Sequence, residues 1–299
     1  MKSESQSLLE WYEKLNYYMP WRKDADPYKI WISEIMLQQT QVETVKRYFS
    51  AWIDKYPNIE KLSKSNIDDI LKLWEGLGYY KRAHHILETA KIIVSDYNGQ
   101  LPGKYSELIK LKGIGDYTAS AISSIAFNKP YPAIDGNLKR VLSRLYCLNN
   151  TKTFEAKLKH IVLKYMECNL PGNINQAFMD LGREICTPQK PKCNDCPLNY
   201  YCKAYKTSKV YLYPIKNKKI KKKPVYDVVV GLIYKENKFL IAKRKKNVLL
   251  GGLWELPGGK KKHKEDNADC LHREIKEELN ITVKINKKIG IIKHNYSHF

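Results

Sequence analysis

The sequence predicts a mostly α-helical protein with a smaller α/β part at its C-terminal end, and two observations lead to this prediction. Up to about residue 205, apolar residues recur at helical spacing in one segment after another. After about residue 225, apolar residues instead gather in short strand-like runs around one amphipathic segment. A chain of 299 residues is long enough to form two such domains.

The expected helices of the first part are separated by short stretches rich in glycine and proline, which interrupt regular structure. The segments with helical spacing are residues 8–15, 42–53, 67–77, 84–94, 117–127, 138–146 and 154–166. Thr40 and Glu43 have the spacing of a capping box at the start of the second segment. We therefore expect Thr40 to cap that helix.

A basic segment separates the two parts. Residues 206–224 carry eight lysines and no acidic residue, a composition typical of an exposed linker, although its charge could also contact phosphates. The strand-like and helical segments that follow are residues 227–234, 238–245 and 281–293 for strands and 266–279 for a helix. The predicted division is therefore a domain at 1–205, a linker at 206–224 and a domain at 225–299.

The chain is strongly basic. Its 53 lysines and arginines stand against 31 acidic residues, which gives a net charge of +22 at pH 7 and indicates a polyanionic partner such as nucleic acid. A membrane surface and a merely solubilising charge are the alternatives, but no basic amphipathic segment stands out. The N-terminus lacks the apolar region of a signal peptide, and no apolar run could span a bilayer. We therefore expect a cytoplasmic protein that does not bind membranes.

Four of the seven cysteines lie within one short segment with the spacing C-x6-C-x2-C-x5-C: Cys186, Cys193, Cys196 and Cys202. In a cytoplasmic protein such a group favours metal binding over disulfides. Structural zinc usually takes two tight C-x2-4-C pairs, and only one tight pair is present here. Thiolates also ligate iron–sulfur clusters. The spacing alone leaves both kinds of metal site open.

Several segments together carry a resemblance to one family. The cysteine spacing after a helix-rich domain resembles the [4Fe–4S] loop of the helix-hairpin-helix DNA glycosylases, and LKGIGDYTASAI at 111–122 is similar to their hairpin. With WISEIMLQQTQV, GLGYYKRA and AIDGNLKRVLSRLY, the chain resembles the adenine DNA glycosylases of the MutY type. The resemblance implies a two-part helical glycosylase domain and a [4Fe–4S] cluster held by the four cysteines.

The resemblance also implies an activity and a partner. It implies a base-excision repair enzyme that removes adenine paired with 8-oxoguanine or guanine in double-stranded DNA, and that acts as a monomer. In a bacterium, such a protein would be associated with the nucleoid. Two rivals are a nucleotide hydrolase that carries a DNA-binding domain and a DNA-binding redox sensor.

Two carboxylates stand in different surroundings. Glu34 has apolar neighbours that would raise its pKa, although the polar stripe of an amphipathic helix would also accommodate it. Asp135 stands where a helix N-cap would stand, and a helix N-terminus favours its anion. One carboxyl that protonates and one that stays charged is the pairing that cleaves glycosidic bonds. By the resemblance, Glu34 donates a proton to adenine and Asp135 stabilises the oxocarbenium-like sugar.

Tyr117 bears on the outcome of the reaction. In the related endonuclease III branch, a lysine at this position of the hairpin forms a Schiff base and cuts the strand. A phenol cannot form an imine. The resemblance therefore implies a monofunctional glycosylase in which Tyr117 bonds near Asp135, whereas a core tyrosine is the plainer interpretation. An endonuclease III-like pyrimidine glycosylase with lyase activity is the closest alternative.

A base within a duplex must be flipped out before an enzyme can act on it. By the resemblance, Gln39, with Gln38 beside it, is the candidate plug for the stack, and Tyr79 is the candidate wedge. Both could equally be loop residues at helix ends. The hairpin turn of Gly113, Ile114 and Gly115 would bring backbone amides to a phosphate, although such a segment is often just a tight turn that binds nothing. The residues that the resemblance assigns to the adenine pocket are Trp21, Arg22 and Gln176.

Residues 225–299 resemble the first part of a Nudix domain. Glu274, Glu277 and Glu278 have spacings on one helix that could gather Mg²⁺, although an acidic surface helix would look the same. In adenine glycosylases this domain recognises 8-oxoguanine, and the segment that resembles its recognition loop is Tyr296, Ser297 and His298. The chain ends at Phe299 inside this loop, so we expect a partial Nudix-like domain.

Overall fold

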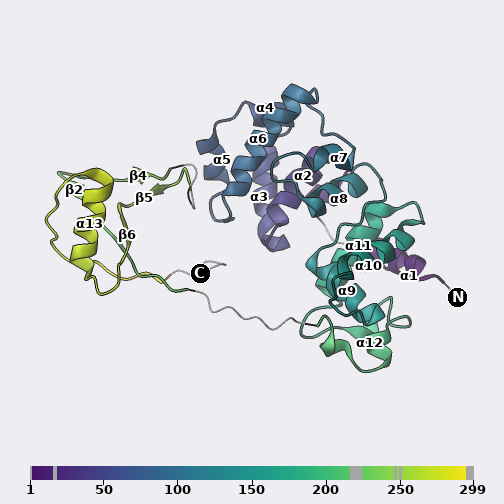
Figure 1. The fold of residues 1–299 in the computed structure, drawn as a ribbon. Coiled ribbons are helices and arrows are strands. Elements are labelled where there is room, and N and C mark those ends of the chain that lie inside the picture. Colours follow the sequence, from purple (N-terminus) through teal and green to yellow (C-terminus); the bar gives the residue numbers. More distant parts are fainter. Residues whose placement is uncertain (1, 16–18, 216–223, 246–247, 249–250, 294–299) are drawn as a thin grey trace. The chain divides into compact units, whose positions relative to one another are not determined.

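The structure is a computed structural model that describes residues 2–15, 19–215, 224–245, 248 and 251–293. The chain divides into two compact units, Met1–Asn217 and Lys218–Phe299 (Figure 1). Among the described residues, no helix has both the length and the apolar character needed to cross a membrane. Residues 216–223 of the predicted linker lie outside the described residues.

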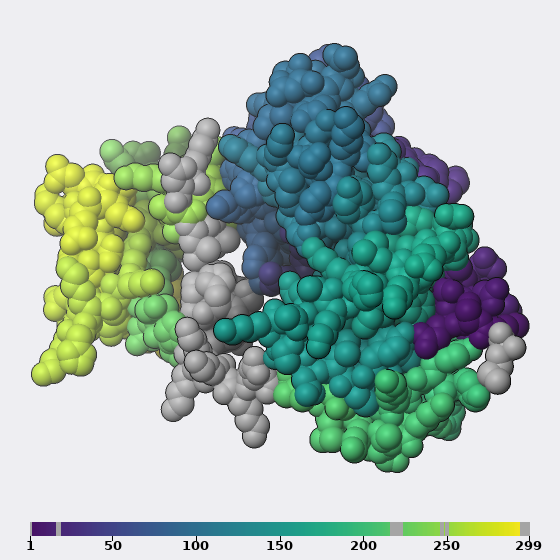
Figure 2. All heavy atoms as spheres, turned by 45° about the vertical axis from the view of Figure 1, so that its right-hand side comes forward, coloured from purple at the N-terminus to yellow at the C-terminus, as the bar shows by residue number. Residues whose placement is uncertain are grey.

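The first unit is helical, as predicted. It contains α1 (Glu4–Glu13), η1 (Pro20–Arg22), α2 (Pro27–Leu37), α3 (Val42–Lys55), α4 (Ile59–Ser63), α5 (Ile67–Leu73), α6 (Lys81–Asp96), α7 (Tyr105–Leu108), α8 (Asp116–Ile125), α9 (Gly136–Tyr146), α10 (Phe154–Met166), α11 (Pro171–Glu184), η2 (Cys193–Asp195), α12 (Lys203–Lys206) and η3 (Val210–Leu212). The elements η1 and α2–α8 pack together as a first lobe, and α1 and α9–α12 pack as a second lobe (Figure 1). Helices α8 and α11 join the lobes, which meet along one face as the blue and teal regions of Figure 2.

Each lobe has its own core. In the first lobe the rings of Trp52 and Trp74, both fully buried, meet edge to face at 5.6 Å. In the second lobe the buried ring of Phe178 on α11 lies 4.9 Å from that of Tyr165 on α10. The cysteine segment also packs against this second core, through Leu198 and the partly buried Cys196.

Helix α2 is buried on nearly every side. Asp26 caps its first amides and Pro27 occupies its first position, a combination that starts a helix sharply. Eight of its eleven residues are buried, so α2 runs through the first lobe as a central helix. A carboxylate on such a helix has no solvent-facing stripe to occupy. The interpretation of Glu34 as a surface residue of an amphipathic helix is therefore wrong.

The predicted capping box at Thr40 is also wrong. Helix α3 begins one residue later, with Gln41 at the N-cap position and no side-chain capping bond. The Thr40 hydroxyl instead donates to the carbonyl oxygen of Gln38 at 3.4 Å. The turn from α2 to α3 uses this hydroxyl, and the capping pattern in the sequence could not reveal that competing bond.

The second unit is small and contains strands, as predicted. Strands β1 (Val228–Val230) and β6 (Gly258–Lys260) pair antiparallel, as do β2 (Tyr234–Lys235) with β3 (Lys238–Phe239) and β4 (Ala242–Lys243) with β5 (Trp254–Glu255). Helix α13 (Asn267–Leu279) packs on β1 and β6 with Cys270 and Ile275 fully buried.

The strand predicted at residues 281–293 does not form. Residues 280–293 contain no strand, and Ile289, Ile291 and Ile292 are exposed over at least 73% of their surface. A β-strand is stable only when a neighbour pairs with its backbone, and none of the described strands pairs with this segment. The strand-like composition of residues 281–293 was therefore not enough to form a strand.

Gly182 on α11 permits the close approach of α9. A Cβ at this position would lie 2.5 Å from the Cβ of Asn137 and 3.0 Å from its Cα. We expect Gly182→Ala to lower the free energy of unfolding by about 1–3 kcal/mol, because α9 would have to shift. Gly136→Ala is the matched control, since no heavy atom lies within 4 Å of its Cβ position. In thermal denaturation, equal stability of the two variants would contradict this packing argument.

Candidate active site

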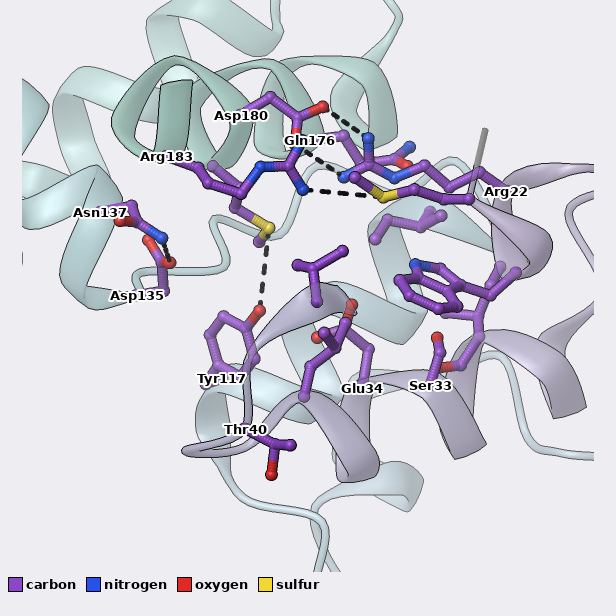
Figure 3. A pocket seen from close by; sticks show the side chains of 17 residues that line it. Arg22, Ser33, Glu34, Thr40, Tyr117, Asp135, Asn137, Gln176, Asp180 and Arg183 are labelled. Atoms are coloured by element: carbon purple, nitrogen blue, oxygen red, sulfur yellow. Dashed lines mark hydrogen bonds and ion pairs between the residues drawn. The ribbon is translucent and has the colours of Figure 1, made fainter. Parts of the chain in front are cut away.

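A cavity of about 170 Å³ contains the residues that the sequence nominated for catalysis and for the base pocket (Figure 3). The predicted residues that line it are Trp21, Arg22, Glu34, Tyr117, Asp135 and Gln176. They come from η1 and α2 of the first lobe, from α8, and from α9 and α11 of the second lobe. The cavity therefore lies where the two lobes of the first unit meet, and Glu34 and Asp135 share it.

Glu34 is 5% exposed and lines the cavity from α2. Burial, with a smaller contribution from the charge of Asp135, raises the pKa of its carboxyl to about 7 against the opposing effects of Tyr117 and Arg22. Its Oε2 atom has no hydrogen-bond partner among the described residues. A buried carboxyl that titrates near neutral pH and has a vacant oxygen can donate a proton to a bound molecule.

Asp135 caps α9, as the sequence indicated. Its Oδ1 accepts the amide of Leu138 at 2.6 Å, and its Oδ2 accepts the side-chain amide of Asn137 at 2.9 Å. Burial nevertheless raises the pKa of Asp135, although these bonds oppose protonation. The sequence predicted the cap and its preference for the anion, but not the burial, which favours the protonated form.

Tyr117 enters the cavity from the first turn of α8. Its hydroxyl lies 3.8 Å from the sulfur of Met179, as the dashed line in Figure 3 marks. Burial raises the pKa of this phenol well above its usual value, and the charges of Glu34 and Asp135 add to the effect. The phenol is therefore neutral near neutral pH and can serve as a hydrogen-bond donor beside both carboxyls.

An arginine–carboxylate group on the far side of the cavity was not found from the sequence. Arg22 donates to both oxygens of Asp180, at 2.5 and 3.3 Å, and Arg183 lies 3.4 Å from the same carboxylate. Burial disfavours the charged form of Arg22. The charge and hydrogen bonds of Asp180 together outweigh burial and raise the pKa of Arg22. Asp180 and Arg183 stand three residues apart on α11, but no sequence pattern indicated that this face meets the cavity.

The loop that leads to Asp135 is held by Asn175, a second residue that the sequence analysis missed. Asn175 on α11 is fully buried. Its side chain accepts the amide of Ala133 at 3.1 Å and donates to the carbonyl of Tyr131 at 2.9 Å and to the Ser124 hydroxyl at 2.7 Å. Two of these bonds hold the loop and the third ties Asn175 to α8, so together they fix the direction from which Asp135 enters the cavity.

The candidate DNA-contacting residues lie outside this cavity, on turns of the first lobe. Gln39 is exposed after α2 and Tyr79 is 37% exposed before α6, both in the left-handed backbone region with φ of 59° and 47°. Gly113 and Gly115 are exposed in the turn before α8, whereas Ile114 is buried and anchors that turn.

The cysteine segment is tied to α9 by two arginines. Arg144 is 3% exposed and donates to the carbonyls of Thr187 at 2.7 Å and Pro188 at 3.0 Å, with its Nη1 3.3 Å from the Cys186 sulfur. Arg140 donates to the Cys186 carbonyl at 2.7 Å and to the Asn137 side chain at 2.8 Å. Since Asn137 also donates to Asp135, a continuous set of polar contacts links this segment to the cavity.

The chemistry of the four thiols suits a metal cluster. Burial raises the pKa of Cys193 and Cys202, and that of Cys196 to about 12, so these thiols would be protonated at neutral pH unless a cation replaced the proton. Cysteine thiolates are the ligands that hold iron–sulfur clusters, so this segment fits such a group.

Comparison with known families places these features in one class. Residues 32–164 match the helix-hairpin-helix superfamily of base excision DNA repair proteins, and residues 186–202 match the iron–sulfur binding domain of endonuclease III. Residues 228–299 match the NUDIX domain. The first unit is thus the domain of a helix-hairpin-helix base excision repair protein with an iron–sulfur segment.

Relatives identify the family within that class. An adenine DNA glycosylase of Buchnera aphidicola from Schizaphis graminum is 42% identical over 305 residues, which cover 99% of this chain and 84% of that protein. One from Arabidopsis thaliana is 33% identical over 332 residues, covering 95% of this chain and 52% of that protein. The chain belongs to the adenine DNA glycosylase family. Its fold is similar to a thermostable thymine-DNA glycosylase, with 28% identity and a TM-score of 0.62 over 68% of this chain and 95% of that chain.

Only some of the site residues that the sequence predicted in the second unit are described by the structure. Glu274, Glu277 and Glu278 lie on α13, where Glu274 and Glu277 contact Arg273 and Glu278 accepts the Gly258 amide at 3.3 Å. Arg273 also binds Glu265 at 2.7 Å, so this acidic face is engaged in ion pairs. The predicted recognition residues Tyr296, Ser297 and His298 lie outside the described residues.

Loss of one cysteine ligand should remove the iron. We expect Cys193→Ser to lose the bound iron and the visible absorption of an iron–sulfur protein, because a serine oxygen is a poor ligand for iron in such a cluster. Cys168→Ser is the control, since Cys168 lies outside the segment and bonds the Tyr165 carbonyl, as a serine also can. Iron content per chain, measured on both purified proteins, would contradict the ligand assignment if it were equal.

Proposed function

We propose that this chain hydrolyses the N-glycosidic bond of adenine paired with 8-oxoguanine or guanine in duplex DNA. One observation carries the proposal: Glu34, a buried carboxyl with a pKa of about 7 and a vacant oxygen, shares a cavity with Asp135. Family membership supports adenine as the base and DNA as the polymer.

The proposed reaction uses the two carboxyls at different moments. Adenine leaves poorly until a ring nitrogen is protonated, and Glu34 supplies that proton in an enclosed site. As the bond breaks, positive charge develops on the sugar, and the carboxylate of Asp135 stabilises it. Glu34, now ionised, then activates the water that completes hydrolysis. The rate enhancement comes from stabilising this charge-separated state more strongly than the bound substrate.

The other cavity residues hold the base and tune the acid. Trp21 offers an apolar surface for a purine, and Gln176 offers an amide that can both donate and accept. Arg22, held by Asp180, carries a fixed positive charge that keeps the Glu34 pKa from rising further. Tyr117 has no amine with which to form an imine, which supports a monofunctional enzyme.

The exposed turns of the first lobe are the proposed DNA contacts. Gln39 enters the stack where the adenine has left, Tyr79 wedges beside the partner base, and the turn from Gly113 to Gly115 presents amides to a phosphate. We further propose that the cluster is of the [4Fe–4S] type, held by Cys186, Cys193, Cys196 and Cys202. When bound, it would fix the segment's shape. Tyr296, Ser297 and His298 are proposed to contact 8-oxoguanine.

The central test is strand cleavage after alkali. We expect incubation with an A:8-oxoguanine duplex to leave the backbone intact until hot alkali cuts the adenine strand at the target position. Glu34→Gln should lower the single-turnover rate by about 10²- to 10⁴-fold, because a positioned general acid typically contributes that factor and the amide cannot donate an acidic proton.

Two outcomes would contradict the proposal. Cleavage without alkali, together with a covalent adduct trapped by borohydride, would indicate the endonuclease III-like lyase. Unchanged activity of Glu34→Gln would remove the proposed acid from the mechanism.

The rate should fall as the pH rises through 7. The active form of Glu34 is the protonated one, and its pKa in the folded protein is about 7. We therefore expect single-turnover excision to fall about tenfold per pH unit above pH 8, and to fall again in acid, where Asp135 becomes protonated and can no longer stabilise the sugar. Duplex affinity measured with Glu34→Gln at each pH controls for altered binding. A rate that rises between pH 6 and pH 8 would be incompatible with Glu34 as the proton donor.

A further inference from the structure

Arg82 lies at the junction of two turns that are far apart in sequence. It is 9% exposed at the start of α6, and its guanidinium contacts five backbone carbonyls. Its Nη1 lies 2.7, 3.1 and 2.6 Å from the oxygens of Ile35, Met36 and Gln38, and its Nη2 lies 3.1 Å from those of Leu77 and Gly78. One planar group therefore joins the end of α2 to the turn before α6.

Two of these carbonyls belong to the peptide bonds that precede Gln39 and Tyr79. The oxygen of Gln38 belongs to the peptide bond that precedes Gln39, and the oxygen of Gly78 belongs to the one that precedes Tyr79. Both Gln39 and Tyr79 have positive φ, a region that side-chain-bearing residues rarely adopt and keep only when the surroundings hold them there. Arg82 thus fixes the peptide on the N-terminal side of each unusual residue.

The surroundings reinforce this arrangement. The Arg82 guanidinium lies 5.2 Å from the ring of buried Trp74 and 5.5 Å from the ring of Tyr79. The Trp74 indole N–H donates to the Gly78 oxygen at 3.0 Å, so this carbonyl has two donors. The side-chain amide of Gln38 donates to the Thr118 hydroxyl on α8 at 3.2 Å, beside Tyr117. The two turns and the hairpin helix are held as one framework.

We propose that Arg82 is a positioning residue that couples Gln39 and Tyr79, so that plug and wedge act on the duplex together. This inference rests on the proposed function, which assigns those two roles. A lysine could not replace Arg82, because a single ammonium lacks the planar fork that reaches both turns at once. A plainer role also exists, since arginine side chains often satisfy the last carbonyls of a helix such as α2.

The two roles predict different behaviour. A residue that merely caps α2 would lower stability without changing how bound DNA is opened. A residue that couples plug and wedge would lower the opening of the duplex even when the protein is folded and fully bound. The test therefore measures unstacking of the DNA at saturating protein, separately from affinity and from thermal stability.

The experiment uses an A:8-oxoguanine duplex with 2-aminopurine placed beside the target adenine. The fluorescence of 2-aminopurine rises when the base stack opens. Glu34→Gln is present in every protein so that no base is released during the measurement. We expect Arg82→Lys to reduce the fluorescence change at saturation and, in the otherwise native chain, to reduce single-turnover excision about tenfold or more. Tyr28→Phe is the control, since Tyr28 is also buried in the first lobe and also donates to a backbone carbonyl, that of Tyr56 at 2.7 Å, away from these turns.

The outcomes are distinct. A full fluorescence change for folded, saturated Arg82→Lys would overturn the inference, as would an equal reduction in Tyr28→Phe. If the native chain releases no adenine at all, the proposed function fails, whereas the fluorescence comparison still judges the coupling.

A second route applies if Arg82→Lys does not fold. Gln39→Asn and Tyr79→Asn shorten each side chain while keeping a residue that tolerates positive φ. Coupled residues should give a double variant whose excision rate differs from the product of the two single effects. Strictly multiplicative effects would overturn the inference.

Discussion

The enclosure of one carboxyl between two helical lobes is the constraint on which the rest of the site depends. Glu34 is placed on a helix with almost no solvent-facing side, so its pKa is set by burial rather than by any single neighbour. The cavity around it exists only because α8 and α11 bring the second lobe against the first. Burial of an ionisable group destabilises a fold when the group is charged, and the site retains such a group where proton transfer would use it.

The second carboxyl shows how the same environment can treat two acids differently. Glu34 is buried and Asp135 partly buried, and both have raised pKa values, but Asp135 receives an amide from its own helix and another from Asn137. Glu34 keeps one oxygen without a partner in the described part of the chain. The difference in proposed role therefore follows from hydrogen bonds to the charged form, which Asp135 has and the vacant Glu34 oxygen lacks.

Four arginines hold segments of the chain together around this site, and they do so in two ways. Arg22 is paired with the carboxylate of Asp180, whereas Arg82, Arg140 and Arg144 are directed mainly at backbone carbonyls. Binding carbonyls leaves the charge of the guanidinium uncompensated, and burial lowers the pKa of Arg82 to about 10. This still leaves it charged at neutral pH, so a rigid cationic fork joins segments that no secondary structure connects.

The sequence by itself determined the helical character of the first unit, the nomination of Glu34 and Asp135, and the cysteine segment, because helical periodicity, capping residues and motif spacing are local properties. It misjudged Thr40, where a local pattern met a competing bond, and residues 281–293, where strand composition found no pairing neighbour. Only the tertiary structure decided that Asp180, Arg183 and Asn175 face the cavity and its approach, and that Arg82 joins two distant turns. These facts depend on which surfaces meet after the chain has folded, and no periodicity along the sequence encodes the meeting of residues so far apart.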